Sequence, residues 1–111
     1  MRRITVQRGA KMLIQLETKE SCTTIALHGQ FVFDTHRDFR DASTRALQEA
    51  SQEIQIDLSK LGYMDSSALG MLLVFNDKAK DAGKRVVLNN GQGEISELLK
   101  LTRMETMLAI A

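Results

Sequence analysis

Hydrophobic and polar residues alternate in several short segments of the chain, and this period of two predicts β-strands. Residues 12–17 (MLIQLE) and 23–28 (TTIALH) are the first two predicted strands. The connection between them is short and polar, which predicts an antiparallel hairpin. Residues 53–58 (EIQIDL) alternate most regularly, residues 85–88 (RVVL) predict a fourth strand, and residues 107–110 are a candidate last strand.

Between these strands, apolar positions recur with the spacing of an α-helix. Residues 35–50 predict a first helix, for which Asp34 or Thr35 is the expected N-terminal cap. After the most regular strand we expect a turn at residues 60–62, then a second helix from residue 65 or 66 to about residue 82. Residues 94–101 predict a short third helix.

The resulting order of elements is β-β-α-β-α-β-α-β. Helices that connect successive strands act as crossovers, so the later strands are expected to be parallel. The sequence therefore predicts an α/β fold, a single domain over residues 12–111 with a mixed sheet of four to five strands and helices packed on it. Residues 1–11 carry basic residues without an acid between them, and we expect a solvated, flexible N-terminal arm.

The composition of the 111 residues, 43% hydrophobic and 26% charged, is that of one globular domain. A net charge of +1 predicts no attraction to nucleic acid or to anionic membranes. The single cysteine, Cys22, excludes an intrachain disulfide and fits a reducing compartment. No apolar run is long enough for a signal peptide or a membrane span, so a soluble cytoplasmic protein is expected.

The sequence lacks the residue patterns of common catalytic, metal-binding and phosphate-binding sites. Two histidines and one cysteine stand apart, without the spacing of metal ligands. The segment around Ser66 lacks the first glycine of a nucleophile elbow, and no glycine-rich loop precedes Lys-Ser or Lys-Thr. We therefore expect a protein that is not an enzyme and needs no cofactor.

The segment LGYMDSSALG, residues 61–70, joins the most regular strand to the second helix. Asp65, Ser66 and Ser67 are all good capping residues, so helix capping alone would explain them. Gly70 is different, because a glycine inside a helix costs about 1 kcal/mol relative to alanine. It suggests the close approach of another backbone or of a partner. The two hydroxyls also lie at the carboxyl edge of the sheet, where open α/β sheets place their sites.

Residues 57–70 (DLSKLGYMDSSALG) resemble the signature of STAS domains, and specifically of anti-sigma-factor antagonists. The likeness extends from about residue 12 over the rest of the chain, and residues 36–42 also resemble single-domain members of partner-switching pathways. The resemblance implies that Ser66 is phosphorylated by an anti-sigma factor that is also a serine kinase with a histidine-kinase-like ATPase fold. It further implies a metal-dependent serine phosphatase that removes the phosphate. The unphosphorylated form would bind its partner and the phosphorylated form would release it.

The expected partner-binding surface surrounds this serine. Its candidate residues are Asp34, Asp65, Ser66, Ser67, Leu69 and Gly70. One departure from the family pattern is Val32, which stands where an acidic residue is common; Asp34 either substitutes for that residue or only caps the first helix. Core packing is the default expectation for the phenylalanines, but Phe31 and Phe33 alternate across Val32, so one face of this loop is available to a partner.

Three further interpretations remain open at this point. A downstream signalling enzyme is another candidate partner of the same surface. A nucleotide-binding regulatory domain would use the Ser66 junction together with Asp34. A STAS subunit of a transport assembly is the third, because such domains also occur in transporters.

Overall fold

The structure is a computed structural model that describes residues 2–50 and 52–111. In this part of the chain, six strands form one sheet in the order β1-β2-β3-β4-β5-β6. The strands are β1 (Arg2–Arg8), β2 (Met12–Lys19), β3 (Cys22–Phe31), β4 (Glu53–Met64), β5 (Arg85–Asn89) and β6 (Ala109–Ile110). The helices are α1 (His36–Glu49), α2 (Ser66–Asp81) and α3 (Gly93–Leu101), with 3-10 turns η1 (Phe33–Thr35) and η2 (Met104–Thr106).

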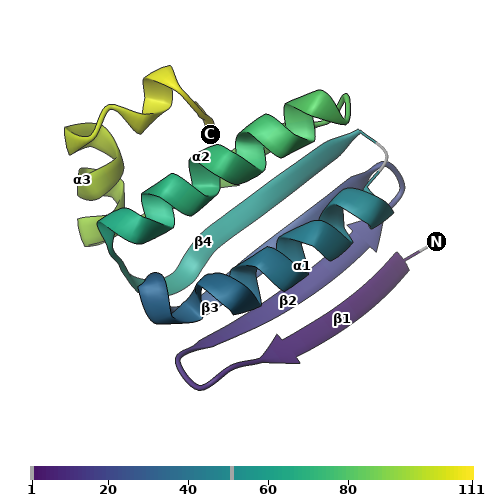
Figure 1. The fold of residues 1–111 in the computed structure, drawn as a ribbon, viewed down its shortest axis with the longest axis horizontal. Coiled ribbons are helices and arrows are strands. Elements are labelled where there is room, and N and C mark those ends of the chain that lie inside the picture. Colours follow the sequence, from purple (N-terminus) through teal and green to yellow (C-terminus); the bar gives the residue numbers. More distant parts are fainter. Residues whose placement is uncertain (1, 51) are drawn as a thin grey trace.

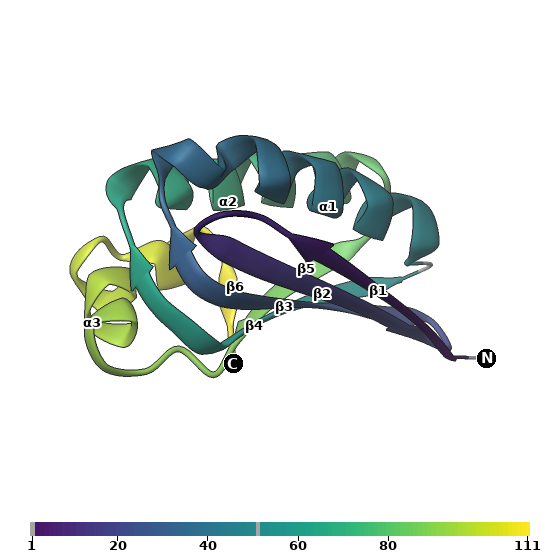
Figure 2. The same cartoon turned by 90° about the horizontal axis from the view of Figure 1, so that it is seen from below.

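The sheet is mixed, as the order of elements predicts. The pairs β1–β2 and β2–β3 are antiparallel, whereas β3–β4, β4–β5 and β5–β6 are parallel. Helices α1 and α2 lie next to each other on one face of the sheet, and α3 lies at one end of it (Figures 1 and 2). The predicted α/β fold is confirmed, with one strand more than expected. Among the described helices, none has the length and apolar character needed to cross a lipid bilayer.

The additional strand is β1, in the segment where the sequence predicts a flexible arm. Arg2–Arg8 pairs along its length with β2, from Arg2 opposite Lys19 to Arg8 opposite Leu13. The side chain of Gln7 also donates a hydrogen bond to the backbone carbonyl of Asp38 in α1 (3.0 Å). The apolar residues of β1, Ile4 and Val6, remain about half exposed. Because an edge strand buries so little, its sequence lacks the strong alternation that would reveal it.

Strand β4 is longer than its hydrophobic pattern predicts. The expected turn at residues 60–62 is wrong, because β4 continues to Met64. The register with β3 shifts twice in the second half of β4, and each shift inserts one extra residue into β4. Buried side chains therefore change from a spacing of two (Ile56, Leu58) to a spacing of three (Leu61, Met64). Such bulges break the regular alternation, and the extended strand brings the start of α2 alongside the end of β3.

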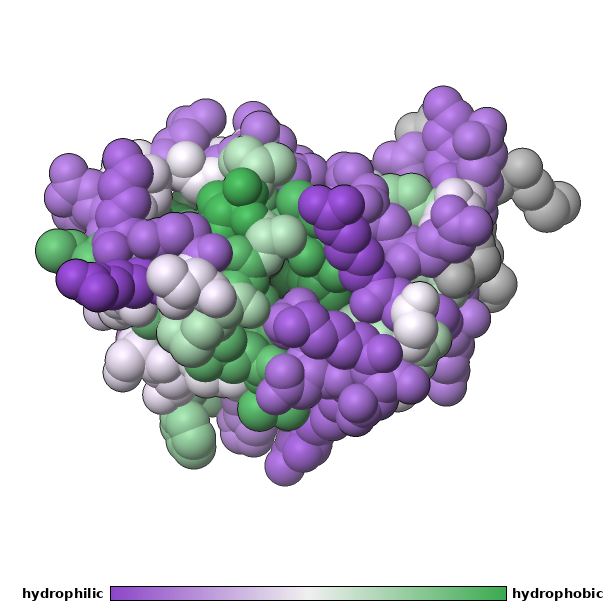
Figure 3. All heavy atoms as spheres, turned by 90° about the horizontal axis from the view of Figure 1, so that it is seen from above, coloured by the Kyte–Doolittle hydropathy of each residue, from purple (hydrophilic) through white to green (hydrophobic). Residues whose placement is uncertain are grey.

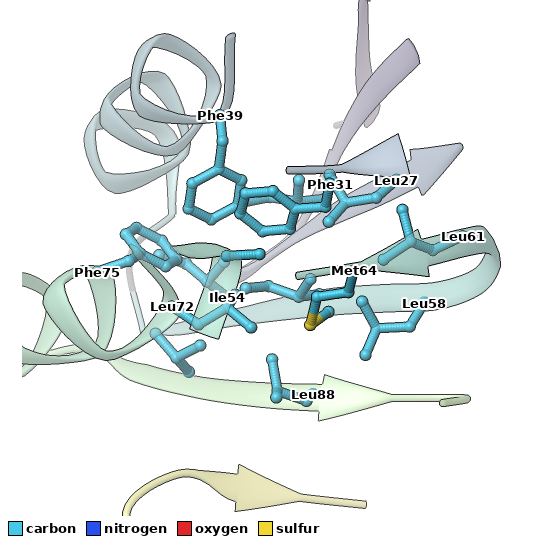
Figure 4. Close-up of a cluster of buried hydrophobic side chains, with 14 of the residues drawn as sticks. Leu27, Phe31, Phe39, Ile54, Leu58, Leu61, Met64, Leu72, Phe75 and Leu88 are labelled. Atoms are coloured by element: carbon cyan, nitrogen blue, oxygen red, sulfur yellow. The ribbon is translucent and has the colours of Figure 1, made fainter. Parts of the chain in front are cut away.

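The core between the sheet and the two long helices contains a cluster of three phenylalanines (Figure 4). The ring of Phe39 in α1 lies 4.6 Å from that of Phe31 and 5.8 Å from that of Phe75, measured between centroids. All three side chains are nearly inaccessible to solvent. Burial of such a side chain contributes about 1.5–3 kcal/mol to stability, so this cluster fixes α1 and α2 against the end of β3. Core packing is confirmed for these three phenylalanines and wrong for Phe33, which is exposed.

Candidate functional site

The carboxylate of Asp65 organises the junction between β4 and α2. Asp65 is extended at the N-cap of α2, and its Oδ1 accepts a hydrogen bond from the backbone N–H of Ala68 (3.0 Å). Its Oδ2 accepts a second bond, from the backbone N–H of Phe33 in η1 (3.1 Å). Bonds to a charged acceptor are stronger than neutral ones. One side chain therefore caps the helix, as predicted, and also ties it to a loop 32 residues earlier.

The loop that Asp65 holds presents an exposed aromatic ring. The side chain of Phe33 is 63% exposed. Its backbone carbonyl accepts a hydrogen bond from Nδ1 of His36 (2.7 Å), and the two rings are stacked with centroids 5.0 Å apart. Both backbone polar groups of Phe33 are thus engaged. The ring is exposed on a backbone that is already fixed.

Thr35 stabilises this loop in a way that differs from its expected role as a cap. It occupies the N-cap position of α1 but makes no capping hydrogen bond there. Instead, its buried hydroxyl accepts a bond from the N–H of Val32 (3.0 Å) and donates one to the carbonyl of the same residue (2.9 Å). Thr35, one of the two candidates, is therefore the N-cap residue, but its side chain does not make the expected capping hydrogen bond. Its hydroxyl closes the η1 turn that precedes the helix.

Ser66 is the first residue of α2 and its side chain is exposed. Its hydroxyl makes no hydrogen bond to the part of the chain that the structure describes. Ser67 is half-buried and lines a groove between α1 and α2. We call the exposed area formed by Phe33, Asp65, Ser66 and Ser67 the junction surface. At its centre, the Ser66 hydroxyl can be modified without breaking a contact of the fold.

Two of the other predicted contact residues differ in their environments. Leu69 is only 7% exposed and belongs to the hydrophobic core, so it supports the junction surface from below and offers a partner little area. Gly70 is exposed, and a Cβ atom at this position would meet no other element of the described chain within 4 Å. The close approach of another part of the chain, one of the two expectations for Gly70, is therefore wrong. The approach of a partner stays a prediction.

Asp34 is exposed and carries an ion pair. Its Oδ2 lies 2.7 Å from Nζ of Lys11, which is in the connection between β1 and β2. The hydrogen bond and the positive charge of Lys11 hold the pKa of Asp34 below its ordinary value. Exposed pairs of this kind add little to stability. The ammonium group of Lys11 nevertheless offsets the negative charge of the Asp34 carboxylate. Among the described residues, no group of three His, Cys, Asp or Glu side chains is arranged to hold a metal ion.

An open groove runs from the junction surface along the two helices. It has a volume of about 490 Å³ and is mainly apolar. Its lining comes from η1, from one side of α1 and from one side of α2: Phe33, His36, Phe39, Arg40, Ser43, Ser67, Gly70, Met71, Val74, Phe75 and Lys78. The sequence did not reveal this groove. The only signal was the spacing of three and four residues along α2, which by itself indicates core packing.

Comparison with known proteins agrees with this architecture. The family model described as "Mlab, STAS domain" matches residues 14–109. The chain belongs to the STAS domain family. A STAS-domain containing protein of Pseudomonas aeruginosa (strain UCBPP-PA14) is 36% identical over 88 residues, which are 79% of this chain and 86% of that protein.

Solved structures of anti-sigma factor antagonists have the same fold as this STAS domain. The unphosphorylated form of the antagonist SpoIIAA superimposes with a TM-score of 0.73 at 22% identity, covering 88% of this chain and 87% of that one. The phosphorylated form of Bacillus SpoIIAA gives 0.67 at 22% identity, with 88% and 90% covered. An antagonist of Mycobacterium paratuberculosis gives 0.72 at 19% identity, with 97% and 85% covered. At these identities the similarity concerns the fold.

Proposed function

We propose that this STAS domain is a non-enzymatic binding module of a bacterial partner-switching pathway, an anti-sigma-factor antagonist controlled at Ser66. The unphosphorylated protein binds an anti-sigma factor that is also a serine kinase with a histidine-kinase-like ATPase fold. Phosphorylation of Ser66 releases that partner, and a metal-dependent serine phosphatase restores binding. The observation that carries the proposal is the exposed Ser66 hydroxyl, which makes no hydrogen bond within the described part of the chain and lies next to the hydrogen-bonded Asp65 carboxylate.

A phosphate on Ser66 is compatible with the folded domain. It adds about −1.5 to −2 charges and three acceptor oxygens. At the first turn of a helix, free backbone N–H groups and the helix dipole stabilise an anion by about 0.3–1 kcal/mol. The net charge of the whole chain, +1, would change only to about −1. Phosphorylation therefore acts locally, through what it does to the contact surface.

The same phosphate disfavours docking at the junction surface. A bulky dianion would be added to the surface that the partner covers, and it must lose water when the partner binds. Asp65 next to it adds negative charge at the same place. A loss of about 3 kcal/mol in binding free energy corresponds to a weakening of about 100-fold. The solved structures of unphosphorylated SpoIIAA and of phosphorylated Bacillus SpoIIAA support the compatibility of this fold with both states.

Binding by two Ser66 variants tests the proposal. Ser66→Ala and Ser66→Asp are used as baits in extracts of the native cell, and captured proteins are quantified by mass spectrometry. A partner enriched with Ser66→Ala and depleted by about 100-fold or more with Ser66→Asp is expected. Thr44→Asp, which adds the same charge at an exposed position of α1, should capture that partner as wild type does.

Two further measurements complete this test. Phosphopeptide analysis of the protein from native cells should find phosphate on Ser66, and none at this site in Ser66→Ala. Thermal unfolding of Ser66→Asp should differ from wild type by less than about 0.5 kcal/mol, as for other surface substitutions. Equal capture by the alanine and aspartate variants would show that no switch operates at Ser66.

The two alternative functions stay predictions. A nucleotide-binding role would rely on Asp34, but its carboxylate is paired with Lys11. Calorimetry with ATP and GTP tests that role directly. A role as a subunit of a transport assembly predicts stable copurification with a membrane transporter, independent of the residue at position 66.

A further inference from the structure

The groove between α1 and α2 is a continuation of the junction surface. Its floor is formed by apolar side chains that include Phe39, Met71 and Phe75. Phe33 borders it at the Ser67 end, and Val74 lies in its middle; these two side chains are 63% and 54% exposed. Large exposed apolar side chains that meet at a hollow are typical of docking surfaces. A partner bound over Ser66 would have this groove directly beside it.

The charges along the groove have one sign. Arg40 of α1 and Lys78 of α2 line it from opposite sides, and both are exposed. Neither side chain has an ion-pair partner among the described residues, and none of the described lining residues is acidic. A ligand that complements this surface is therefore apolar in the middle and negatively charged at its margins.

The size of the groove matches a helix. On α2 it extends from Ser67 to Lys78, about 16 Å at a rise of 1.5 Å per residue. Small residues, Ser43, Ser67 and Gly70, lie along its walls and permit close approach of another backbone. Gly70 is informative, because glycine within a helix costs about 1 kcal/mol, and among the described residues no other element lies within 4 Å of the position that a Cβ would take. A third helix packed between α1 and α2 would use that space.

We propose that the groove receives an amphipathic helix of the partner, about three turns long, whose apolar face is flanked by acidic residues. This inference rests on the proposed function, since the partner is the protein that binds over unphosphorylated Ser66. Apolar residues spaced by three and four positions would contact the floor, as in other helix-in-groove complexes. The flanking acids would face Arg40 and Lys78. A phosphate on Ser66, at one end of the groove, would then repel the same acids that the groove attracts.

A pair of synthetic helical peptides tests the groove without the partner. Both peptides carry the same leucine face, one with glutamates and the other with lysines beside it. Binding is followed by NMR titration of the isotope-labelled protein. We expect the glutamate peptide to bind at least about tenfold more tightly, with shifts concentrated on the groove-facing residues of α1 and α2.

Charge reversal provides the matched variants. Arg40→Glu combined with Lys78→Glu should invert the preference, so that the lysine peptide binds more tightly. Arg45→Glu combined with Lys80→Glu makes the same change in net charge on the same two helices outside the groove, and should leave the preference as in wild type. Equal binding of both peptides, shifts outside the groove, or no inversion would overturn the proposal. Binding of oleate without either peptide, or self-association through these helices, would also overturn it.

Binding of the partner captured by Ser66→Ala to the groove variants tests this inference separately from the proposed function. The double variant Arg40→Glu, Lys78→Glu should bind that partner at least about tenfold more weakly than wild type. The control variant Arg45→Glu, Lys80→Glu should bind it as wild type does. A partner that responds to Ser66→Asp but not to the groove variants would overturn the groove and leave the switch intact. A partner that binds equally to Ser66→Ala and Ser66→Asp would contradict the switch, and the peptide titration would then decide the groove alone.

Discussion

Helix α2 is held in different ways at its two ends. At the start, both carboxylate oxygens of Asp65 accept backbone hydrogen bonds, one from α2 itself and one from Phe33. Toward the other end, the side-chain amide of Asn76 donates a single, longer bond to the carbonyl of Met107 (3.3 Å). The helix ends at Asp81, and Gly83, which follows the C-cap residue Ala82, has a φ of +74°, the left-handed conformation common after helix ends.

Both ends also have exposed apolar side chains, in different settings. Figure 3 views the molecule from the edge that carries α3, η2 and the C-terminus, and shows an apolar area in a hollow among hydrophilic residues. A cavity of about 510 Å³ lies on this side between α2 and the η2–β6 segment. Its lining mixes Lys80 and Arg85 with Glu105, and β6 is only two residues long. The groove at the start of α2 has borders of a single sign and a loop fixed by Asp65.

This difference matters for binding. A partner that docks on side chains already held in place loses less conformational entropy than one that must order them. Phe33 meets that condition, because its backbone N–H and carbonyl are hydrogen-bonded and its ring stacks on that of His36. Exposed apolar area alone would not distinguish the two ends of α2, whereas the hydrogen bonds beneath that area do.

Removal of the Asp65 carboxylate should have the largest effect on stability. Loss of an N-cap costs about 0.5–2 kcal/mol, and the N–H of Phe33 loses a charged acceptor in addition. We expect Asp65→Ala to lower the free energy of unfolding by about 2–3 kcal/mol. Urea denaturation measures this change, and NMR should show new mobility at Phe33.

Two variants control for this prediction. Asp65→Asn keeps a capping oxygen for Ala68 but not the charge, so its stability should lie between those of wild type and Asp65→Ala. Asn76→Ala removes one neutral hydrogen bond at the other end and should cost about 1 kcal/mol. If Asn76→Ala lowered the free energy of unfolding as much as Asp65→Ala, the two ends of α2 would be held equally strongly, contrary to our interpretation.

The fold was largely predictable because its signals are local. The alternation in residues 53–58 and the Asp65–Ser66 helix start depend on neighbours in the sequence, and both are confirmed. The second half of β4 was missed because two bulges change the spacing of its buried residues from two to three. Strand β1 was missed because its apolar residues are half exposed and its arginines suggest a solvated arm.

The site was predictable only in part because its geometry depends on distant contacts. The exposure of Ser66 follows from its place at a helix start, and it agrees with the prediction. The bond between Asp65 and Phe33 joins residues 32 positions apart and leaves no local pattern. Leu69 belongs to the segment of residues 61–70 that predicts the contact surface, but its side chain lies in the core. The groove requires the relative position of two helices.

Replacing glycine by alanine should change the free energy of unfolding in opposite directions near the two ends of α2. At Gly70 the Cβ meets nothing and the helix gains propensity, so Gly70→Ala should raise the free energy of unfolding by up to about 1 kcal/mol. At Gly83 the space is also open, but φ is +74°, so Gly83→Ala should lower it by about 1–2 kcal/mol. Thermal and urea unfolding of both variants measure the two signs.

The Gly70→Ala variant also tests whether the groove binds a helix. Gly70→Ala should weaken binding of the glutamate peptide despite the more stable fold, because the methyl group occupies space that the incoming helix uses. A Gly70→Ala protein that is less stable than wild type would contradict the open environment of this glycine. Unchanged peptide affinity would argue against close helix contact at Gly70.

The ion pair between Lys11 and Asp34 should have the smallest effect, since both side chains are exposed. Because Lys11 lowers the pKa of Asp34, the stability that the pair provides is complete above the ordinary aspartate pKa of about 3.9 and is lost as the pH falls through the lower value of the folded state. NMR titration of the Asp34 carboxyl group should therefore give a higher pKa in Lys11→Gln than in wild type, while Lys100→Gln, in α3, leaves it unchanged. High salt should reduce the difference by screening. An Asp34 pKa that does not respond to Lys11→Gln would mean that this carboxylate is free in solution and remains available to a partner at the junction surface.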